Sequence, residues 1–158
     1  MLTLIALGKL KEPFYRSAVA EYEKRLRAYG GVRILELPEV RLPDDPSPAQ
    51  IDAALKKEAD AVRQHLGKNC WLCVFTPEGK LLSSPDLAET LASVRSGGKS
   101  DLTFLLGSSF GIHQSLKAQG DFLLSMSPMT FPHHLARVMA LEQLYRAESI
   151  CAGSKYHK

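Results

Sequence analysis

The sequence predicts an α/β fold, a parallel sheet covered by helices, in one domain that spans residues 1–158. Segments typical of strands and of helices alternate from one end of the chain to the other, which is the pattern of parallel strands joined by helices. The strand-like segment Cys70–Phe75 is apolar without interruption, as in a central strand that is buried on both faces. The length of 158 residues suits a single hydrophobic core.

The first elements are two strands separated by a helix. Leu2–Leu7 is an apolar run with the composition of a strand. Pro13 begins a stretch in which Phe14, Tyr22 and other apolar residues recur at helical spacing, and proline is favoured in the first turn of a helix. Val32–Leu37 is expected to be the second strand.

A second helix and a buried strand follow a segment rich in proline and aspartate. Ser47, Pro48 and Gln50 have the order of an N-cap, a first-turn proline and the partner in a capping box. We expect this helix to end at Gly67, because glycine readily adopts the left-handed conformation of a helix cap. Cys70–Phe75 is expected to be the next strand, buried on both faces.

The second half of the chain continues the alternation. Ser84 is expected to cap a helix whose first turn contains Pro85 and which ends at Gly97 and Gly98, and Leu102–Leu106 is expected to be the next buried strand. A short helix is expected around residues 114–118 and a short strand at 122–124. The final helix is expected from about residue 133 to residue 152.

The final helix has apolar residues around most of its circumference. They are Leu135, Val138, Met139, Leu141, Leu144, Tyr145 and Ile150. A helix with this distribution buries more than one side. Either its own chain encloses it, or it forms an interface between two copies, for which a symmetric homodimer is the commonest arrangement. We expect the homodimer.

Composition and charge exclude several classes of protein. No apolar run approaches the roughly 20 residues that span a bilayer, and the first residues lack the pattern of a secretion signal. A cytoplasmic protein without a membrane partner is therefore expected, and only three cysteines agree with a reducing compartment. The net charge of +3 permits a nucleic-acid partner. The basic residues within positions 1–33 either face phosphate or form a solvated helix surface.

Ligands of an open parallel sheet bind beyond the carboxyl ends of its strands. Three segments in that position stand out, at 76–80, 107–111 and 126–132, and none contains a dinucleotide or phosphate-loop motif. A glycine directly after a buried strand allows a ligand to approach the backbone, and the third segment offers backbone donors beside apolar side chains. Together they could hold an adenine and a thioether, or the glycines could serve as turns alone.

Other chemistries find little support. Cys70 and Cys73 form a Cys-x-x-C pair, but both fall within a predicted strand and no second pair completes a zinc site. We expect buried thiols and no metal. No Gly-x-Ser-x-Gly elbow supports serine hydrolase chemistry. The end of the chain concentrates Tyr156, His157 and Lys158, which form either a frayed tail or part of a site.

Several motifs, in a fixed order, are distributed along almost the whole chain. They are segments 7–11 and 21–25, Gly107 after the fourth strand, segment 129–133, Arg137 with Val138, segment 142–147, and the terminal Tyr156-His157-Lys158. With them the chain closely resembles the bacterial large-subunit rRNA pseudouridine N3-methyltransferase family (methyltransferase H) of the SPOUT class. The resemblance implies a C-terminal part threaded as a trefoil knot, a rare arrangement, and a homodimer that binds S-adenosylmethionine in the knot.

The resemblance also implies the residues of the cofactor site. They are Phe75, Gly107, Met126, Ser127, Pro128, Met129, Thr130 and Phe131. Two positions depart from the family, since Ser108 stands where a second glycine is common and Phe75 where leucine is common. The implied substrate is a pseudouridine in the intersubunit stem-loop of 23S rRNA, methylated at N3.

The sulfonium of the cofactor already carries an activated methyl group, so the protein has to align it with N3 and favour loss of the N3 proton, without a metal. We expect Tyr156 and His157 to position the base, with His157 the leading candidate for accepting the proton. Arg137 is expected to counter negative charge or hold a phosphate. His133 is a second candidate, or else a contact at the start of the last helix.

Two alternatives stay open at this point. One is a methyltransferase of the same class that acts on tRNA. The other is a non-catalytic ribosome-binding or RNA-binding module that uses its basic first helix and binds no cofactor.

Overall fold

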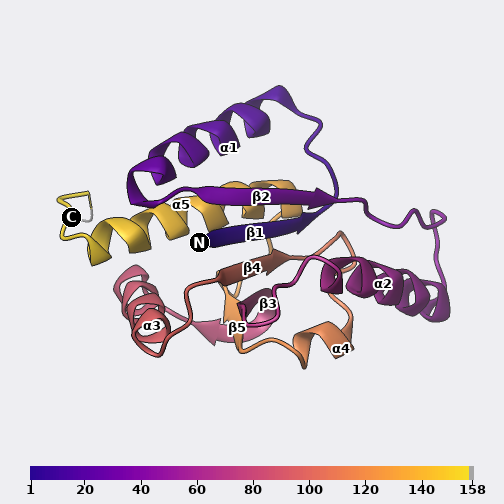
Figure 1. The fold of residues 1–158 in the computed structure, drawn as a ribbon. Coiled ribbons are helices and arrows are strands. Elements are labelled where there is room, and N and C mark those ends of the chain that lie inside the picture. The colour runs from indigo at the N-terminus through magenta and orange to yellow at the C-terminus, as the bar shows by residue number, and fades with distance from the viewer. Residues whose placement is uncertain (157–158) are drawn as a thin grey trace.

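The computed structural model describes residues 1–156 and contains a five-stranded sheet (Figure 1). The strands are β1 (Leu2–Leu7), β2 (Val32–Leu37), β3 (Trp71–Leu81), β4 (Leu102–Leu106) and β5 (Phe122–Ser125). Their order across the sheet is β2-β1-β4-β3-β5, and every neighbouring pair is parallel. The predicted α/β fold with a parallel sheet is confirmed.

Helices cover both faces of this sheet. They are α1 (Pro13–Leu26), α2 (Pro48–Arg63), α3 (Ser84–Ser96), α4 (Gln114–Lys117) and α5 (His133–Cys151), with a 3₁₀ turn at Arg27–Tyr29. Leu4 and Phe104 belong to a core with α1, α3 and α5, whereas Ile5 and Leu105 pack with α2 and α4. Successive strand residues point to opposite faces, so uninterrupted apolar strands fill both cores.

Two predicted helix starts are capped by side chains. The Ser47 hydroxyl accepts from the backbone N–H of Gln50 over 3.2 Å, and the Gln50 side chain accepts from the Ser47 backbone N–H, which is the predicted capping box. The start of α3 lies one residue earlier than expected. Its N-cap is Ser83, because Asp86 and Ser83 form the reciprocal pair and leave Ser84 as the first helical residue.

The prediction that Gly67 caps α2 in a left-handed conformation is wrong. The helix ends at Arg63, and Gly67 is not among the glycines with positive φ. A Cβ at Gly67 would instead lie 2.8 Å from Oδ2 of Asp101. Close packing against the residue before β4 therefore accounts for this glycine.

Residues 76–80 were expected to form a loop, and they are part of β3. The strand continues to Leu81 and pairs again with β5 after a register shift between Phe75 and Lys80. A Cβ at Gly79 would lie 2.6 Å from backbone atoms of Leu124, so the irregular strand approaches β5 at a distance that only glycine permits. Cys70 likewise falls just before β3, whereas Cys73 is buried inside it, where burial raises the pKa of its thiol.

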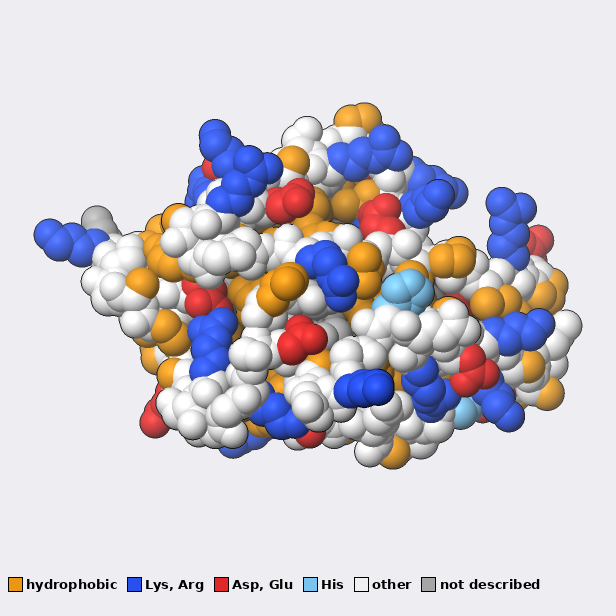
Figure 2. All heavy atoms as spheres, in the orientation of Figure 1, with side chains coloured by type: hydrophobic (Ala, Val, Ile, Leu, Met, Phe, Trp, Pro, Cys, Tyr) orange, Lys and Arg blue, Asp and Glu red, His pale blue; other side chains and the backbone are white. Residues whose placement is uncertain are grey.

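Within residues 1–156, no helix is both long and apolar enough to cross a membrane. No three His, Cys, Asp or Glu side chains of that range are grouped as a metal site would need. Figure 2 shows Lys and Arg side chains over α1 at the top of the view, with acidic side chains between them.

Candidate active site

A cavity of about 760 Å³ opens at the carboxyl ends of β4 and β5 and beside the irregular part of β3. Its walls come from segments 75–78, 106–112 and 125–133, together with Lys117 and Ala136. This is the edge at which open parallel sheets bind ligands. The volume lies within the roughly 300–1,000 Å³ of small-molecule pockets.

The turn after β4 forms one wall of the cavity. Ser108 and Gly111 exchange backbone hydrogen bonds of 3.2 and 2.9 Å, which close the turn. A Cβ at Gly107 would lie 2.5 Å from the carbonyl oxygen of Gly111, so any side chain there would displace the turn. Gly111 has a φ of +93°, a conformation that favours glycine. The glycines therefore allow the tight turn that lines this side of the cavity.

Two carboxylates from outside the turn hold it in place. The Ser108 hydroxyl donates to Oε2 of Glu58 on α2 over 2.8 Å, and the Ser109 backbone N–H donates to Oε1 of Glu39 over 3.0 Å. Glu58 is 3% exposed and also accepts from the backbone N–H of Val40. Burial raises the pKa of Glu58, and these hydrogen bonds oppose that effect. The segment after β2 and helix α2 thus support the turn.

The segment after β5 forms the opposite wall. The Ser125 hydroxyl donates to the carbonyl of Ser127 over 3.1 Å, and the Ser127 hydroxyl accepts from the backbone N–H of Met129 over 3.0 Å. The structure brings most of the residues implied for the cofactor to this one cavity. They are Phe75, Gly107, Met126, Ser127, Met129, Thr130 and Phe131. Pro128 lies in the same segment but is not among the residues that line the cavity.

His133 lines the cavity at the first residue of α5. Its Nε2 atom is 3.5 Å from the position that a Cβ on Gly8 would occupy, so the ring lies against the turn after β1. Burial lowers the pKa of His133 below its ordinary value, and the neighbouring His134 acts in the same direction. A neutral imidazole at neutral pH can accept a proton.

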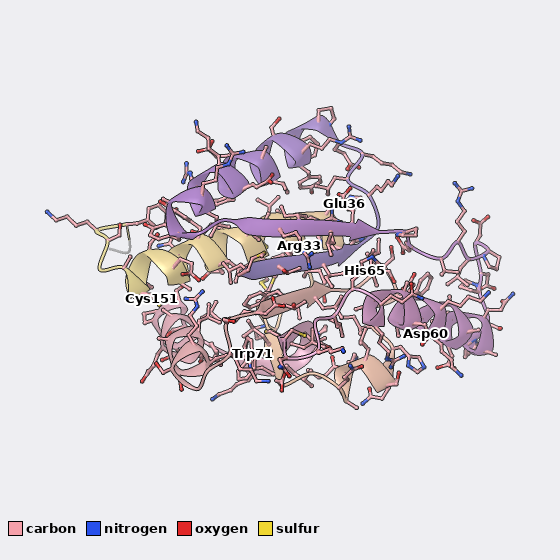
Figure 3. The ribbon with its side chains drawn as sticks, viewed as in Figure 1. Arg33, Glu36, Asp60, His65, Trp71 and Cys151 are labelled. Atoms are coloured by element: carbon pink, nitrogen blue, oxygen red, sulfur yellow. The ribbon has the colours of Figure 1, made fainter. Side chains whose placement is uncertain are left out.

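Arg137 lies one turn further along α5 and is 1% exposed. Its guanidinium forms an ion pair with Glu36 and donates to the carbonyl of Gly8 over 2.8 Å, while Nε has no hydrogen-bond partner. Figure 3 labels Glu36 on β2, the edge strand that supplies this partner. Burial lowers the pKa of Arg137, opposed by Glu36. The guanidinium therefore has a counter-charge inside the protein and no exposed surface for a phosphate.

Tyr156 contacts the middle of α5. Its ring packs edge-on against Tyr145 at 4.7 Å and lies under the guanidinium of Arg146 at 4.7 Å, with its hydroxyl 3.4 Å from Glu142. Glu142 lies nine residues after His133, a rise of about 14 Å along a helix. Figure 1 shows the described end of the chain beside the amino ends of the strands, away from the cavity edge. Tyr156 is thus remote from the cavity of its own chain, and His157 lies outside the described residues.

Two cavity residues were missed by the sequence interpretation as candidates. Glu78 of β3 and Lys117 of α4 line the cavity and form an ion pair, and the Thr76 hydroxyl donates to the same carboxylate. Lys117 and Thr76 together lower the pKa of Glu78 to about 2. Glu78 lies in one of the three segments that the sequence singled out, whereas nothing in the sequence marks Lys117.

Comparison with known proteins agrees with this geometry. The family model described as "Predicted SPOUT methyltransferase" matches residues 1–157. A protein of Methanococcus maripaludis named "Putative ribosomal RNA large subunit methyltransferase H" is 39% identical over 157 residues, which cover 99% of this chain and 99% of that protein. The resemblance inferred from the sequence motifs is thereby confirmed, and the chain belongs to the SPOUT methyltransferase family.

Proposed function

We propose that this protein transfers a methyl group from S-adenosylmethionine to N3 of a pseudouridine in 23S rRNA. The observation that carries the proposal is the convergence of Phe75, Gly107 and all of segment 126–131 except Pro128 on one cavity at the carboxyl edge of the sheet. Membership of a methyltransferase family supports methyl transfer, and the full-length relative carries the name of a large-subunit rRNA methyltransferase. Ribosomes as the substrate would place the reaction in the cytoplasm.

The cavity fits the cofactor that this family implies. The aromatic ring of Phe75 and the side chains of Leu106 and Ile112 provide apolar walls for an adenine. Only a glycine at position 107 lets the turn fold back against the end of β4, since a Cβ there would clash with Gly111 and Ile112, and this turn presents its backbone groups along the cavity wall. We propose that the segment Met126–Phe131 encloses the other side of the ligand. The cofactor supplies an activated methyl group, and the protein has to orient it.

We further propose that the C-terminal part of the chain is threaded as a trefoil knot. The order of strands supports this path, because the chain runs from β3 to β4 and then returns past β3 to place β5 at the sheet edge. The segment after β5 then leads into α5, which packs between α1 and α3. In such a knot the loops around β4 and β5 pass close together, which is where the cavity lies.

A homodimer would complete the site. Several apolar side chains of α5 are only half-buried, among them Val138, Met139 and Ile150. Tyr156 packs against α5 about 14 Å or more from the start of that helix, on the helical rise alone. We propose that α5 forms part of the dimer interface and that the tail of one subunit, with Tyr156 and His157, reaches the cavity of its partner.

Within this composite site each polar residue has a proposed role. Tyr156 and His157 position the pseudouridine, and His157 accepts the N3 proton or donates to the developing anion. His133, kept neutral by its buried position, is the alternative acceptor. Arg137 acts as a positioning residue, because its ion pair with Glu36 joins the start of α5 to the end of β2.

The decisive experiment is transfer of a labelled methyl group to ribosomes, followed by mass mapping of the modified nucleotide. Label at N3 of a pseudouridine in 23S rRNA is the expected result. Label in tRNA instead would identify a different methyltransferase of the same class. Salt-sensitive RNA binding without cofactor binding or transfer would identify a non-catalytic RNA-binding module.

A further inference from the structure

An ion pair lines the cavity at its β3 side. Glu78 and Lys117 are the two formally charged side chains among the described residues that line the cavity. Lys117 comes from α4 and its side chain is largely buried, whereas the Glu78 side chain is about half exposed. The Thr76 hydroxyl donates to the second oxygen of Glu78 and fixes the orientation of the carboxylate. The pair therefore joins β3 to α4 at one end of the cavity.

Each partner of this pair has unused hydrogen-bonding capacity. An ammonium group has three N–H donors, and Lys117 uses one of them toward Glu78. A carboxylate offers about four acceptor positions, of which Lys117 and Thr76 occupy two on Glu78. A ligand that carries both a carboxylate and an ammonium could therefore bind the two side chains without breaking their contact.

The position of the pair separates it from His133. The sheet order is β1-β4-β3, and His133 lies against Gly8 at the end of β1 while Glu78 belongs to β3. Adjacent strands are about 4.8 Å apart, so roughly 10 Å separate the β1 and β3 sides. Apolar side chains and the Gly107 turn lie between. The cavity thus has a charged end and an end with a proton acceptor.

We propose that Lys117 and Glu78 bind the amino-acid end of S-adenosylmethionine, with Lys117 contacting its α-carboxylate and Glu78 its α-ammonium. This inference rests on the proposed function. The amino-acid end is the zwitterionic part of that molecule, whereas its adenosine is uncharged. Complementary charges at one end of a cavity whose other described lining residues carry no formal charge would fix the direction in which the cofactor lies.

Calorimetric titration with two ligands tests the proposal. S-Adenosylhomocysteine carries the amino-acid end, and 5′-methylthioadenosine lacks it. Lys117→Met and Glu78→Gln are each expected to weaken S-adenosylhomocysteine binding about tenfold or more, the effect of losing a charge-assisted hydrogen bond. Both variants should bind 5′-methylthioadenosine within about twofold of the wild type, which also shows that they are folded. Lys80→Met, on the same strand but outside the cavity, is the matched control.

Three results would count against binding of the amino-acid end by Lys117 and Glu78. Unchanged S-adenosylhomocysteine affinity in Lys117→Met and Glu78→Gln would make the pair a structural contact between α4 and β3. Equal weakening for both ligands would indicate a distorted cavity rather than a lost contact. A wild-type protein that binds neither ligand would overturn the proposed function itself, a failure distinct from the first two.

Discussion

The hydroxyl of Ser108 donates a 2.8 Å hydrogen bond to the buried carboxylate of Glu58, which joins the cavity turn to α2. Ser108 stands where the family resemblance of the sequence implies a second glycine. A glycine could not form this contact. The Ser108 side chain therefore attaches the turn to α2, which a glycine at this position would leave unattached.

Replacement of Ser108 by alanine should weaken cofactor binding several-fold. The change removes a donor from a buried carboxylate, at a cost of about 1–3 kcal/mol in the free energy of unfolding, and it frees the turn that lines the cavity. Calorimetry with S-adenosylhomocysteine and urea denaturation measure the two effects. Ser96→Ala, at an exposed position near the end of α3, is the control. Unchanged affinity and stability in Ser108→Ala would show that the contact does not support the turn.

Glu58→Gln should change how stability depends on pH. Burial raises the pKa of the Glu58 carboxyl in the folded protein above 4.5, its ordinary value in an unfolded chain. Over a range of pH, Glu58 is therefore protonated in the folded state and ionised in the unfolded state. The wild type therefore loses stability as pH rises through that range. Glutamine can accept from Val40 and donate to Ser108, so Glu58→Gln should keep the contacts and lack this loss. Its stability relative to the wild type should increase from pH 4 to pH 7, measured by urea denaturation. If the difference in stability between Glu58→Gln and the wild type did not change with pH, the pKa of Glu58 would not be raised. Glu39→Gln is measured in the same way to test the neighbouring carboxylate.

Breaking the Arg137–Glu36 pair should destabilise the fold. Glu36→Ala leaves a buried cation without its partner and should cost about 3–5 kcal/mol, whereas Arg137→Met should cost less because Glu36 can still reach water. Arg25→Ala breaks an exposed pair with Glu21 and should change the free energy of unfolding much less, because water screens that pair. Urea denaturation compares the three variants. The result that would contradict this account is an Arg137→Met variant that is as stable as Arg25→Ala but no longer binds rRNA. Arg137 would then be a phosphate contact.

Removal of residues 156–158 should abolish methyl transfer and leave S-adenosylhomocysteine affinity nearly unchanged, because Tyr156 lies away from the cavity of its own chain. His157→Ala should behave in the same way. In mixed dimers, truncated subunits should regain transfer when paired with Gly107→Ala subunits, which have an intact tail but an obstructed turn. Full transfer by the truncated protein alone would exclude a role for the tail, and loss of both transfer and affinity would indicate misfolding.

Local patterns predicted much of the fold. The capping box of Ser47 and Gln50 spans four residues, so sequence and structure carry the same information there. The buried strand Leu102–Leu106 and the glycine after it predicted one wall of the cavity. Each of these features depends on residues close together in the chain.

Contacts between distant residues could not be predicted. The irregular end of β3 depends on the close approach of Gly79 to Leu124, which belongs to a strand formed much later in the chain. The Glu78–Lys117 pair joins residues 39 positions apart. The internal counter-charge of Arg137 lies 101 positions away on β2. No local spacing in the sequence encodes such pairs, since the path of the chain through the sheet creates them.

Diffraction from crystals soaked with S-adenosylhomocysteine tests the cofactor site most directly. Ligand density should lie between Phe75, the Gly107 turn and segment 126–131, with the amino-acid end beside Lys117. Density at another surface, or an empty cavity at a ligand concentration that saturates the protein in solution, would contradict the assignment of this cavity as the methyl-donor site.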